Sequence, residues 1–268
     1  MQGYRTIDIK AQRDSIGAAC GRYREKRMDN RTRPDISIVV PAYNEVENIP
    51  ILVGEIEKAL GPTGKSFEIV IVEDGSTDGT REVVERLAAE KAHISPVYFD
   101  GNYGQSSGFD AGFKHARGNV IVTIDADLQN DPADIPTLLS KLDEYDAAVG
   151  WRAERKDTWT KKLTSRFANR IRNWATGETI HDTGCSLKAF RREALRDVKL
   201  YTGMHRFLPT LVKIEGGTVT EVKVNHRPRR FGKSKYSIFN RFLKPTMDLL
   251  AVMWMRRRHL NYRIRKEG

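Results

Sequence analysis

Two aspartates separated by a single residue, Asp125 and Asp127, follow a β-branched run at residues 119–124. At the end of a strand, two carboxylates with this spacing project from the rim of the sheet within reach of one cation. Hard oxygen ligands of this kind suit Mg²⁺ or Mn²⁺, which keep open positions for phosphate oxygens. A capped surface turn is the alternative for an isolated Asp-x-Asp motif, which occurs often by chance. The pair therefore predicts a metal site only where other polar groups gather around it.

Polar residues also follow the other strands that the sequence predicts. Ligands of an open α/β sheet bind beyond the carboxyl ends of the strands, so these residues are the first candidates for a site. A solvated turn explains any one of them, but their convergence on one edge of the sheet makes that alternative much weaker. The segments are residues 41–45, 73–79, 125–129 and 150–152.

The elements that must position these residues follow from the periodicity of the chain. Short β-branched runs alternate with amphipathic segments of helical length, which is the pattern of an α/β protein with a mostly parallel, doubly wound sheet and helices on both faces. No Gly-x-Gly-x-x-Gly motif follows the first run, so a dinucleotide-binding fingerprint is absent. The expected strands are residues 36–40, 67–72, 94–99, 119–124 and 147–150, and the expected helices are residues 46–60, 78–91, 105–117 and 132–144.

Beyond Trp151 the regular alternation stops. The sequence predicts a charged helical stretch near 157–176, a loop at 181–186, a helix from about Met204 and a strand at 219–224. A last, amphipathic helix is expected at about 237–258, interrupted by Pro245. Its uncharged stretch, residues 249–255, is far shorter than the ~20 apolar residues that cross a bilayer. We therefore expect this helix to lie on a surface without spanning a membrane.

Composition excludes several classes of protein. The chain has 268 residues, of which 39% are hydrophobic and 30% charged, so neither a disordered nor a fibrous protein fits. Its two cysteines, Cys20 and Cys185, are too few for a disulfide framework or a zinc site and favour a reducing compartment. Charged residues from Arg5 onwards predict the absence of a secretory signal peptide. We therefore expect a location on the cytosolic side of a membrane.

The formal net charge of +11 is unevenly distributed. Residues 223–268 carry fourteen Lys or Arg against two Asp or Glu, residues 1–35 carry nine against five, and residues 36–222 have a net charge of −5. A basic tail of this kind fits a polyanionic partner, either nucleic acid or an anionic lipid surface. The sequence thus predicts a poorly ordered basic leader (1–35), a main domain (36–225) and a basic loop with an amphipathic membrane-surface helix (226–268).

Six motifs, in order along the chain, resemble those of inverting family 2 glycosyltransferases. They are Pro-Ala-Tyr-Asn-Glu at 41, Glu-Asp-Gly-Ser-Thr-Asp-Gly-Thr at 73, Asn-Tyr-Gly-Gln at 102, Asp-Ala-Asp-Leu-Gln-Asn-Asp-Pro at 125, Gly-Trp-Arg at 150 and Arg-Phe-Gly-Lys-Ser-Lys-Tyr at 230. Within that family they are most similar to the polyprenyl-phosphate hexosyltransferases, which include dolichyl-phosphate mannosyltransferase and the undecaprenyl-phosphate sugar transferases. The resemblance runs from residue 36 to about 250 and implies a GT-A fold, a UDP- or GDP-linked sugar donor, and Mg²⁺ or Mn²⁺. The family commonly has Asp-Asp where this chain has Glu73-Asp74, a departure that leaves Asp74 in place.

The resemblance also implies roles for individual residues. The nucleobase and ribose would be held by Pro41, Tyr43, Glu45 and Asp74. The metal, the diphosphate and the sugar would be held by Asp125, Asp127 and Gln129, with the two aspartates as metal ligands and Arg152 near the same diphosphate. Contacts with the donor diphosphate or an acceptor phosphate are implied for Arg206, Arg229, Ser234 and Lys235. Of these residues, the resemblance points to Asp127, Arg206, Arg229 and Lys235 for the chemical step.

The nature of the acceptor decides what else the site needs. A hydroxyl acceptor requires a positioned general base, whereas a phosphate monoester already carries about 1.5 to 2 negative charges and can attack without one. We expect transfer of a hexose to a polyprenyl phosphate at the cytosolic membrane surface. The alternative within enzymes is transfer to a saccharide or other hydroxyl acceptor. A basic nucleic-acid-binding protein is the alternative of another class, but it leaves the acidic strand-end cluster unexplained, so we expect no nucleic acid.

The basic tail is compatible with several partners. Many relatives continue into membrane-spanning helices after the amphipathic segment. For this chain we expect one of three arrangements. The membrane-spanning helices belong to a separate membrane protein, they belong to a longer native chain, or the basic tail takes their place. The apolar face of the last helix could otherwise pack on its own domain or on a second copy in a homo-oligomer.

Overall fold

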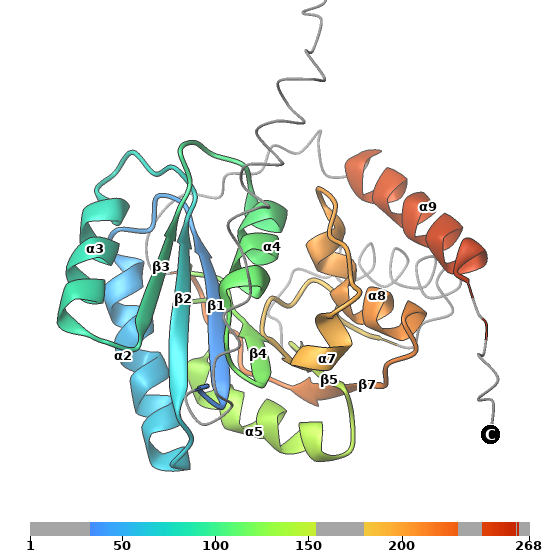
Figure 1. The fold of residues 1–268 in the computed structure, drawn as a ribbon, viewed down its shortest axis with the longest axis horizontal. Coiled ribbons are helices and arrows are strands. Elements are labelled where there is room, and N and C mark those ends of the chain that lie inside the picture. The colour runs from blue at the N-terminus through green and yellow to red at the C-terminus, as the bar shows by residue number, and fades with distance from the viewer. Residues whose placement is uncertain (1–32, 154–179, 230–242, 261, 263–268) are drawn as a thin grey trace, which may run out of the picture. The chain divides into compact units, whose positions relative to one another are not determined.

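The computed structural model describes residues 33–153, 180–229, 243–260 and 262. Its centre is a seven-stranded sheet in the order β3-β2-β1-β4-β6-β5-β7 (Figure 1). All strands run parallel except β6, which is antiparallel to both of its neighbours. The mostly parallel α/β sheet predicted from the sequence is therefore confirmed. The strands are β1 (Ile36–Ala42), β2 (Phe67–Glu73), β3 (Ile94–Tyr98), β4 (Val120–Thr123), β5 (Ala147–Trp151), β6 (Lys188–Arg191) and β7 (Val219–Lys223).

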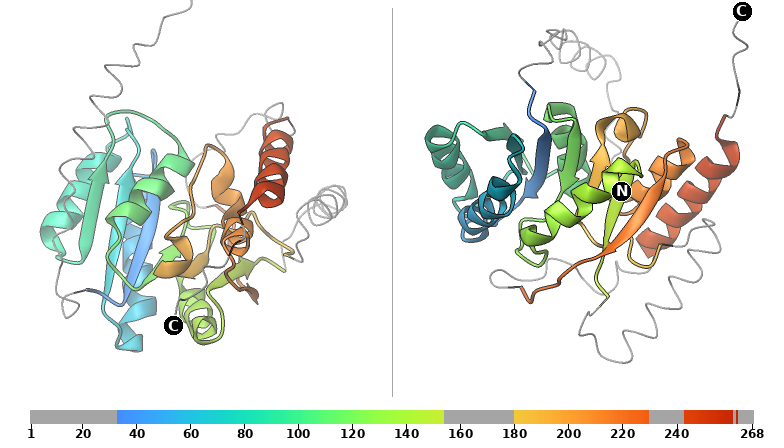
Figure 2. Two further views of the ribbon diagram at one scale, coloured as in Figure 1. Left: turned by 45° about the vertical axis from the view of Figure 1, so that its right-hand side comes forward. Right: turned by 90° about the horizontal axis from the view of Figure 1, so that it is seen from below.

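Helices cover both faces of the sheet (Figure 2). In β1, Ile38 and Val40 belong to one buried cluster, while Val39 belongs to the other, so the strand is apolar on both sides. Strands buried on both faces read as continuous apolar runs, which is how β1 and β2 read in the sequence. The first face is covered by α2 (Asn48–Leu60), α3 (Thr80–Glu90) and α5 (Ile135–Leu139). The second is covered by α4 (Gln105–His115), α7 (Arg192–Leu195) and α8 (Leu208–Ile214).

Two expectations about single elements were wrong. Strand β6 was not expected, because a four-residue segment that includes Lys188 and Arg191 shows no strand pattern. The expected helix at 132–144 is divided into a 3-10 turn (Pro132–Asp134), α5 and a second 3-10 turn (Ser140–Asp143), since Pro136 is tolerated only in the first turn of an α-helix. The helix expected from Met204 is present: it begins as a 3-10 turn (Met204–Phe207) and becomes α8 at Leu208, with Pro209 in its first turn.

The last described helix, α9 (Leu243–Arg258), packs on the domain next to α8 (Figure 1). Val252 is fully buried there, against Met204, Phe207 and Leu211. The described helix is continuous through Pro245, so the interruption expected there is not found in it. Within the described residues, every helix is too short or too polar to span a membrane. The expected helical stretch at 157–176 and most of the leader lie outside the described residues, and the three-part division of the chain stays a prediction.

Candidate functional site

The carboxyl ends of β1, β2 and β4 meet at one edge of the sheet. The strands are parallel and in register, with Ala42 opposite Glu73 and Val39 opposite Thr123. The loops that follow are joined by hydrogen bonds, since the Asn44 N–H donates to the Ser76 hydroxyl at 3.0 Å. Polar segments far apart in the sequence therefore share one edge, as the sequence predicts.

Asp74 fixes the loop that leads into α4. Its carboxylate accepts hydrogen bonds from the N–H groups of Tyr103 and Gly104 at 2.6 and 2.8 Å, and from the Asn102 side chain at 3.1 Å. Burial raises the pKa of Asp74, and the two backbone donors act against that rise. This carboxylate thus sets the start of α4, while its predicted contact with the base or ribose stays a prediction.

Residues at the end of β1 also hold neighbouring helices in place. The Glu45 carboxylate accepts from the Asn48 side chain at 2.5 Å and so holds the start of α2. Pro41 lies under α4, where a Cβ added to Gly108 would come within 2.8 Å of the proline ring. Tyr43, which lies between Pro41 and Glu45 in the sequence, is half-buried. The structure brings these three residues to the expected edge, and their contacts with a donor remain a prediction.

Asp125 is held by two neighbours at the end of β4. Its Oδ1 accepts from the Gln105 side chain at 2.5 Å, and its N–H donates to the Ser186 hydroxyl at 3.2 Å. Burial, followed by the negative charge of Asp127, raises the pKa of Asp125 to about 6. A cation beside this carboxylate would offset both effects.

Asp127 begins a strained turn. The next residue, Leu128, has a φ of 60°, a left-handed conformation that costs an ordinary side chain ~1–2 kcal/mol. Full burial of the Leu128 side chain in the core keeps it there. The turn lets the Gln129 N–H donate to Asp127 Oδ1 at 3.2 Å, and it leaves Oδ2 to contact Arg229 Nη2 at 2.8 Å.

The donor set fits a hard divalent cation. The described residues contain no group of three or more His, Cys, Asp or Glu side chains that could hold a metal by themselves. Mg²⁺ is usually bound by one or two carboxylates together with phosphate oxygens and waters, so Asp125 and Asp127 suffice as protein ligands once a diphosphate is present.

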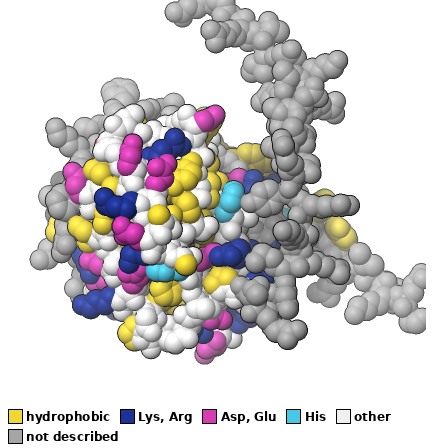
Figure 3. Space-filling view, turned by 60° about the vertical axis from the view of Figure 1, so that its left-hand side comes forward, with side chains coloured by type: hydrophobic (Ala, Val, Ile, Leu, Met, Phe, Trp, Pro, Cys, Tyr) yellow, Lys and Arg dark blue, Asp and Glu magenta, His cyan; other side chains and the backbone are white. Residues whose placement is uncertain are grey.

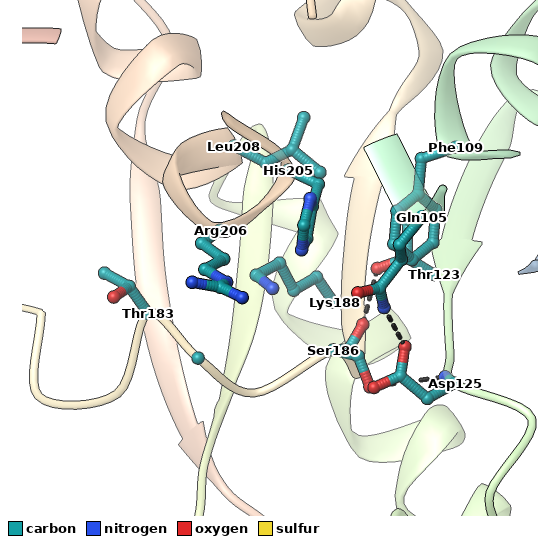
Figure 4. A pocket seen from close by; sticks show the side chains of 11 residues that line it. Gln105, Phe109, Thr123, Asp125, Thr183, Ser186, Lys188, His205, Arg206 and Leu208 are labelled. Atoms are coloured by element: carbon teal, nitrogen blue, oxygen red, sulfur yellow. Dashed lines mark hydrogen bonds between the residues drawn. The ribbon is translucent and has the colours of Figure 1, made fainter. Parts of the chain in front are cut away.

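A cavity of about 170 Å³ opens beside Asp125. Figure 4 shows Gln105, Asp125 and Ser186 on one side of it, and Lys188, His205 and Arg206 facing them from β6 and the turn before α8. The structure therefore brings Arg206 into the neighbourhood of the acidic pair, as the sequence predicts. Two positive groups and one neutral ring face a carboxylate across a space large enough for a small anion.

Arg152 forms an ion pair that the sequence did not predict. Its guanidinium forms two hydrogen bonds with Asp182, at 2.7 and 3.0 Å. Burial acts to lower the pKa of Arg152, but the hydrogen bonds and charge of Asp182 outweigh it and raise the pKa. The side chain is nevertheless near enough to Asp125 to act on the pKa of that carboxyl. Contact of Arg152 with a diphosphate stays a prediction, and Ser234 and Lys235 lie outside the described residues.

Sequence reasoning missed Gln105, Lys188 and His205. Gln105 belongs to the Asn-Tyr-Gly-Gln motif, so its position was marked but its contact with Asp125 was not. His205 precedes Arg206 in the sequence and could have been found with it. Lys188 gave no signal, because it reaches the cavity only through the unexpected antiparallel strand β6.

This sheet order and its acidic strand ends define an α/β fold of the GT-A type. The family model of glycosyl transferase family 2 matches residues 37–199, more than half of the chain. The protein belongs to glycosyltransferase family 2 and is a glycosyltransferase. The sequence-based assignment to this family is confirmed, whereas the polyprenyl-phosphate subgroup stays a prediction.

Solved structures share the fold at low sequence identity. A mannosyltransferase from Pyrobaculum calidifontis, in complex with GDP-Man and Mn²⁺, superposes with a TM-score of 0.56 at 23% identity; the match covers 74% of this chain and 58% of that one. Glucosyl-3-phosphoglycerate synthase from Mycobacterium tuberculosis, in complex with Mn²⁺, UDP-Glc and phosphoglyceric acid, gives a TM-score of 0.58 at 17% identity, covering 84% and 80%. This chain thus spans little more than half of the mannosyltransferase, and the likeness concerns the fold.

Proposed function

We propose that the protein transfers a hexose, with inversion, from a UDP- or GDP-linked sugar to a polyprenyl phosphate at the cytosolic surface of a membrane. The observation that carries the proposal is the cavity beside Asp125. Its described lining contains Arg206 and Lys188, and Asp125 is its one carboxylate. A space with this charge suits an anionic acceptor better than a hydroxyl group that must lose a proton to a base.

The donor side is supported by the acidic pair. Asp125 and Asp127 would hold Mg²⁺ or Mn²⁺, and the mannosyltransferase and synthase structures contain Mn²⁺ together with a nucleotide sugar. When bound, the metal neutralises the charge that builds on the leaving diphosphate. Gln105 positions Asp125 through its 2.5 Å hydrogen bond. The turn at Leu128 positions Asp127 and Gln129.

The chemical step needs no proton acceptor. An oxygen of the acceptor phosphate forms a bond to the anomeric carbon from the face opposite the leaving group. The bond from that carbon to the β-phosphate oxygen breaks, and its electron pair leaves with the nucleoside diphosphate. Arg206 would hold the acceptor phosphate in line for attack, so its contribution is orientation and charge stabilisation.

The membrane contact is supported by α9. Met247, Leu250 and Trp254 are between 58% and 66% exposed and recur at helical spacing, while Val252 on another side of the helix is buried against the domain. Arg256, Arg257 and Arg258 follow at the end of the same helix. An apolar stripe beside a basic cluster is the pattern of a helix that lies in the interface of an anionic membrane.

The charge on one face of the domain favours lipid over nucleic acid as the partner. On the face shown in Figure 3, positive and negative side chains are interspersed, without a continuous basic stripe. Nucleic-acid binding requires such a stripe, since phosphate neutralisation supplies most of the affinity. The basic surface proposed here is the end of α9 and the adjoining tail.

The test is a transfer assay with the full chain and Mn²⁺. UDP- and GDP-linked hexoses are each incubated with a polyprenyl phosphate, the free polyprenol and a soluble saccharide, and lipid-linked sugar is measured. We expect product with the phosphate alone, a rate that rises through the second phosphate pKa of ~6 and then levels off, and a raised acceptor KM in Arg206→Ala. Equal use of the free alcohol, or transfer to the saccharide only, would replace the proposal with the hydroxyl-acceptor alternative.

A further inference from the structure

Lys188 is a buried positive charge on the wall of the cavity. It is 3% exposed, and in the described part of the chain its Nζ donates one hydrogen bond, to the Cys185 carbonyl, and has no carboxylate within ion-pair distance. Burial lowers the pKa of Lys188, while the charges of Asp125 and Asp182 act to raise it. An ammonium group without a direct counter-ion costs stability when buried. A buried titratable group of this kind on the wall of a cavity is therefore a candidate for binding a ligand that supplies the missing charge.

His205 presents a neutral donor to the same space. Its Nδ1 lies 2.7 Å from the Ser106 hydroxyl, and that hydroxyl also accepts the Gly203 N–H at 2.9 Å. The described residues offer the single hydroxyl hydrogen of Ser106 no acceptor except Nδ1, so Nδ1 accepts and the ring proton resides on Nε2. Burial, and then the charges of Arg206 and Lys188, lower the pKa of His205 to about 3. The ring is therefore neutral, and Figure 4 shows it pointing toward Lys188.

We propose that Lys188 and His205, together with Arg206, form the subsite for the phosphate of the acceptor. This inference rests on the function proposed above and names the groups that would bind its second substrate. Two cations match the charge of a phosphate monoester dianion, and three donors match its three terminal oxygens. The neutral imidazole adds a hydrogen bond without adding a third positive charge to a buried space.

The position across from Asp125 separates this subsite from that of the donor. The donor diphosphate belongs with the acidic pair, whose carboxylates require a cation between them and any phosphate. Lys188, His205 and Arg206 face Asp125 from the other side of the cavity and need no such mediator (Figure 4). An anion bound there lies next to the donor site, which is where a nucleophile must be.

Ser106 acts through His205 and is a positioning residue. Its hydroxyl selects the tautomer in which Nε2 carries the proton, and the Gly203 N–H fixes the hydroxyl in turn. In Ser106→Ala both tautomers become available, so the donor toward the phosphate is present only part of the time. Two-bond ¹H–¹⁵N spectra of the ring report this change directly, and a merely structural serine would leave them unaltered.

The experiment measures binding and does not depend on turnover. The full chain, saturated with Mn²⁺ and UDP or GDP, is titrated with citronellyl phosphate, a short soluble isoprenyl phosphate, and in parallel with citronellol. We expect the phosphate to bind and the alcohol not to bind. Lys188→Met should lower the affinity for citronellyl phosphate at least tenfold. Lys58→Met, the same change at an exposed lysine of α2, should leave this affinity unaltered. His205→Phe should lower the affinity for citronellyl phosphate severalfold. His205→Gln keeps a donor near the position of Nε2, so its affinity should be close to that of the wild type.

Nucleotide binding and thermal unfolding provide the controls. Mn²⁺-dependent binding of UDP and GDP should be unchanged in Lys188→Met, and its Tm should be equal to or above that of the wild type, because a costly buried charge has been removed. Lys188→Gln serves the same purpose if the methionine variant does not fold. Unaltered citronellyl phosphate binding in either variant, or an equal loss of nucleotide binding, would overturn the subsite. Intact Lys188-dependent phosphate binding with transfer only to hydroxyl acceptors would instead overturn the proposed function and leave the subsite standing.

Discussion

The guanidinium of Arg229 lies against the carboxylate of Asp127, with 2.8 Å between Nη2 and Oδ2. The contact joins the acidic turn after β4 to the basic segment after β7, and the backbone supports it, since the Arg227 N–H donates to the Gln129 carbonyl at 2.9 Å. Asp127 is also an expected metal ligand. A guanidinium and a divalent cation would therefore compete for the same oxygen, which links metal loading to the position of the basic segment.

Arg229→Met should increase the affinity for Mn²⁺ in the absence of nucleotide by about fivefold, since a partly exposed ion pair is worth about 1 kcal/mol. Titration of the metal alone, followed by calorimetry or by the electron paramagnetic resonance of free Mn²⁺, measures the change. Transfer should nevertheless fall, because the arginine is also expected to contact a phosphate.

The matched control for this variant is Arg227→Met. Arg227 lies two residues away, and among the described residues its guanidinium pairs with Glu55 and Asp131, each at 2.7 Å, and not with Asp127. Its substitution should leave the Mn²⁺ affinity unaltered. Equal Mn²⁺ affinities in the wild type and Arg229→Met would show that the two cations do not compete.

Asp127→Ala, and nearly as strongly Asp125→Ala, should abolish transfer and weaken metal-dependent nucleotide binding while the fold remains. Loss of the charge stabilisation at the leaving group should reduce the rate on the order of 10³-fold or more. Turnover assays and calorimetric titration of UDP and GDP with and without Mn²⁺ measure the two effects. Asp197→Ala, an exposed site, is the control. Near-normal turnover of the folded double variant in the presence of a chelator would exclude the metal mechanism.

The sequence predicted the edge of the sheet better than the contacts made there. Strand-end polarity placed Asp74, Asp125 and Asp127 correctly at one edge, because parallel strands in register bring their carboxyl ends together. The sequence did not reveal that Asp74 fixes the loop before α4. That role depends on the N–H groups of Tyr103 and Gly104, which come close to Asp74 only in the folded chain.

The acceptor side could not be predicted in the same way. Lys188 reaches the cavity because β6 inserts antiparallel between β4 and β5, a pairing between distant segments that no local pattern encodes. The pairing of Arg152 with Asp182 was not predicted, because Asp182 lies thirty positions further on, in a segment that the sequence predicts only as a loop. Long-range partners of charged groups decide such contacts, and spacing along the chain does not identify them.

Folding stability should depend on pH through His205. The pKa of this ring is about 3 in the folded protein, against an ordinary value of 6.5. Between these values the unfolded chain binds a proton that the folded protein excludes, so this contribution is fully present above about pH 6.5 and is lost as the pH falls toward 3. The loss between pH 7 and pH 4 should be roughly 3 kcal/mol in the wild type and absent in His205→Gln. Urea unfolding at both pH values measures it, and parallel behaviour of the two proteins would contradict a buried neutral ring.

Binding to anionic vesicles should depend on the exposed stripe and the arginines of α9. Removal of the whole helix is unsuitable, because Val252 is part of a buried cluster with Met204 and Phe207. Replacement of Met247, Leu250 and Trp254 by serine should abolish flotation with vesicles that contain phosphatidylglycerol, and replacement of Arg256, Arg257 and Arg258 by glutamine should weaken it. Each arginine near such a surface contributes up to ~1 kcal/mol, and salt screens it over ~8 Å, so wild-type binding should fall with ionic strength but not vanish. Glutamine at the exposed Lys58, Lys65 and Lys141 removes the same charge elsewhere on the domain and should have little effect. Equal flotation of all four proteins would place the membrane contact outside α9.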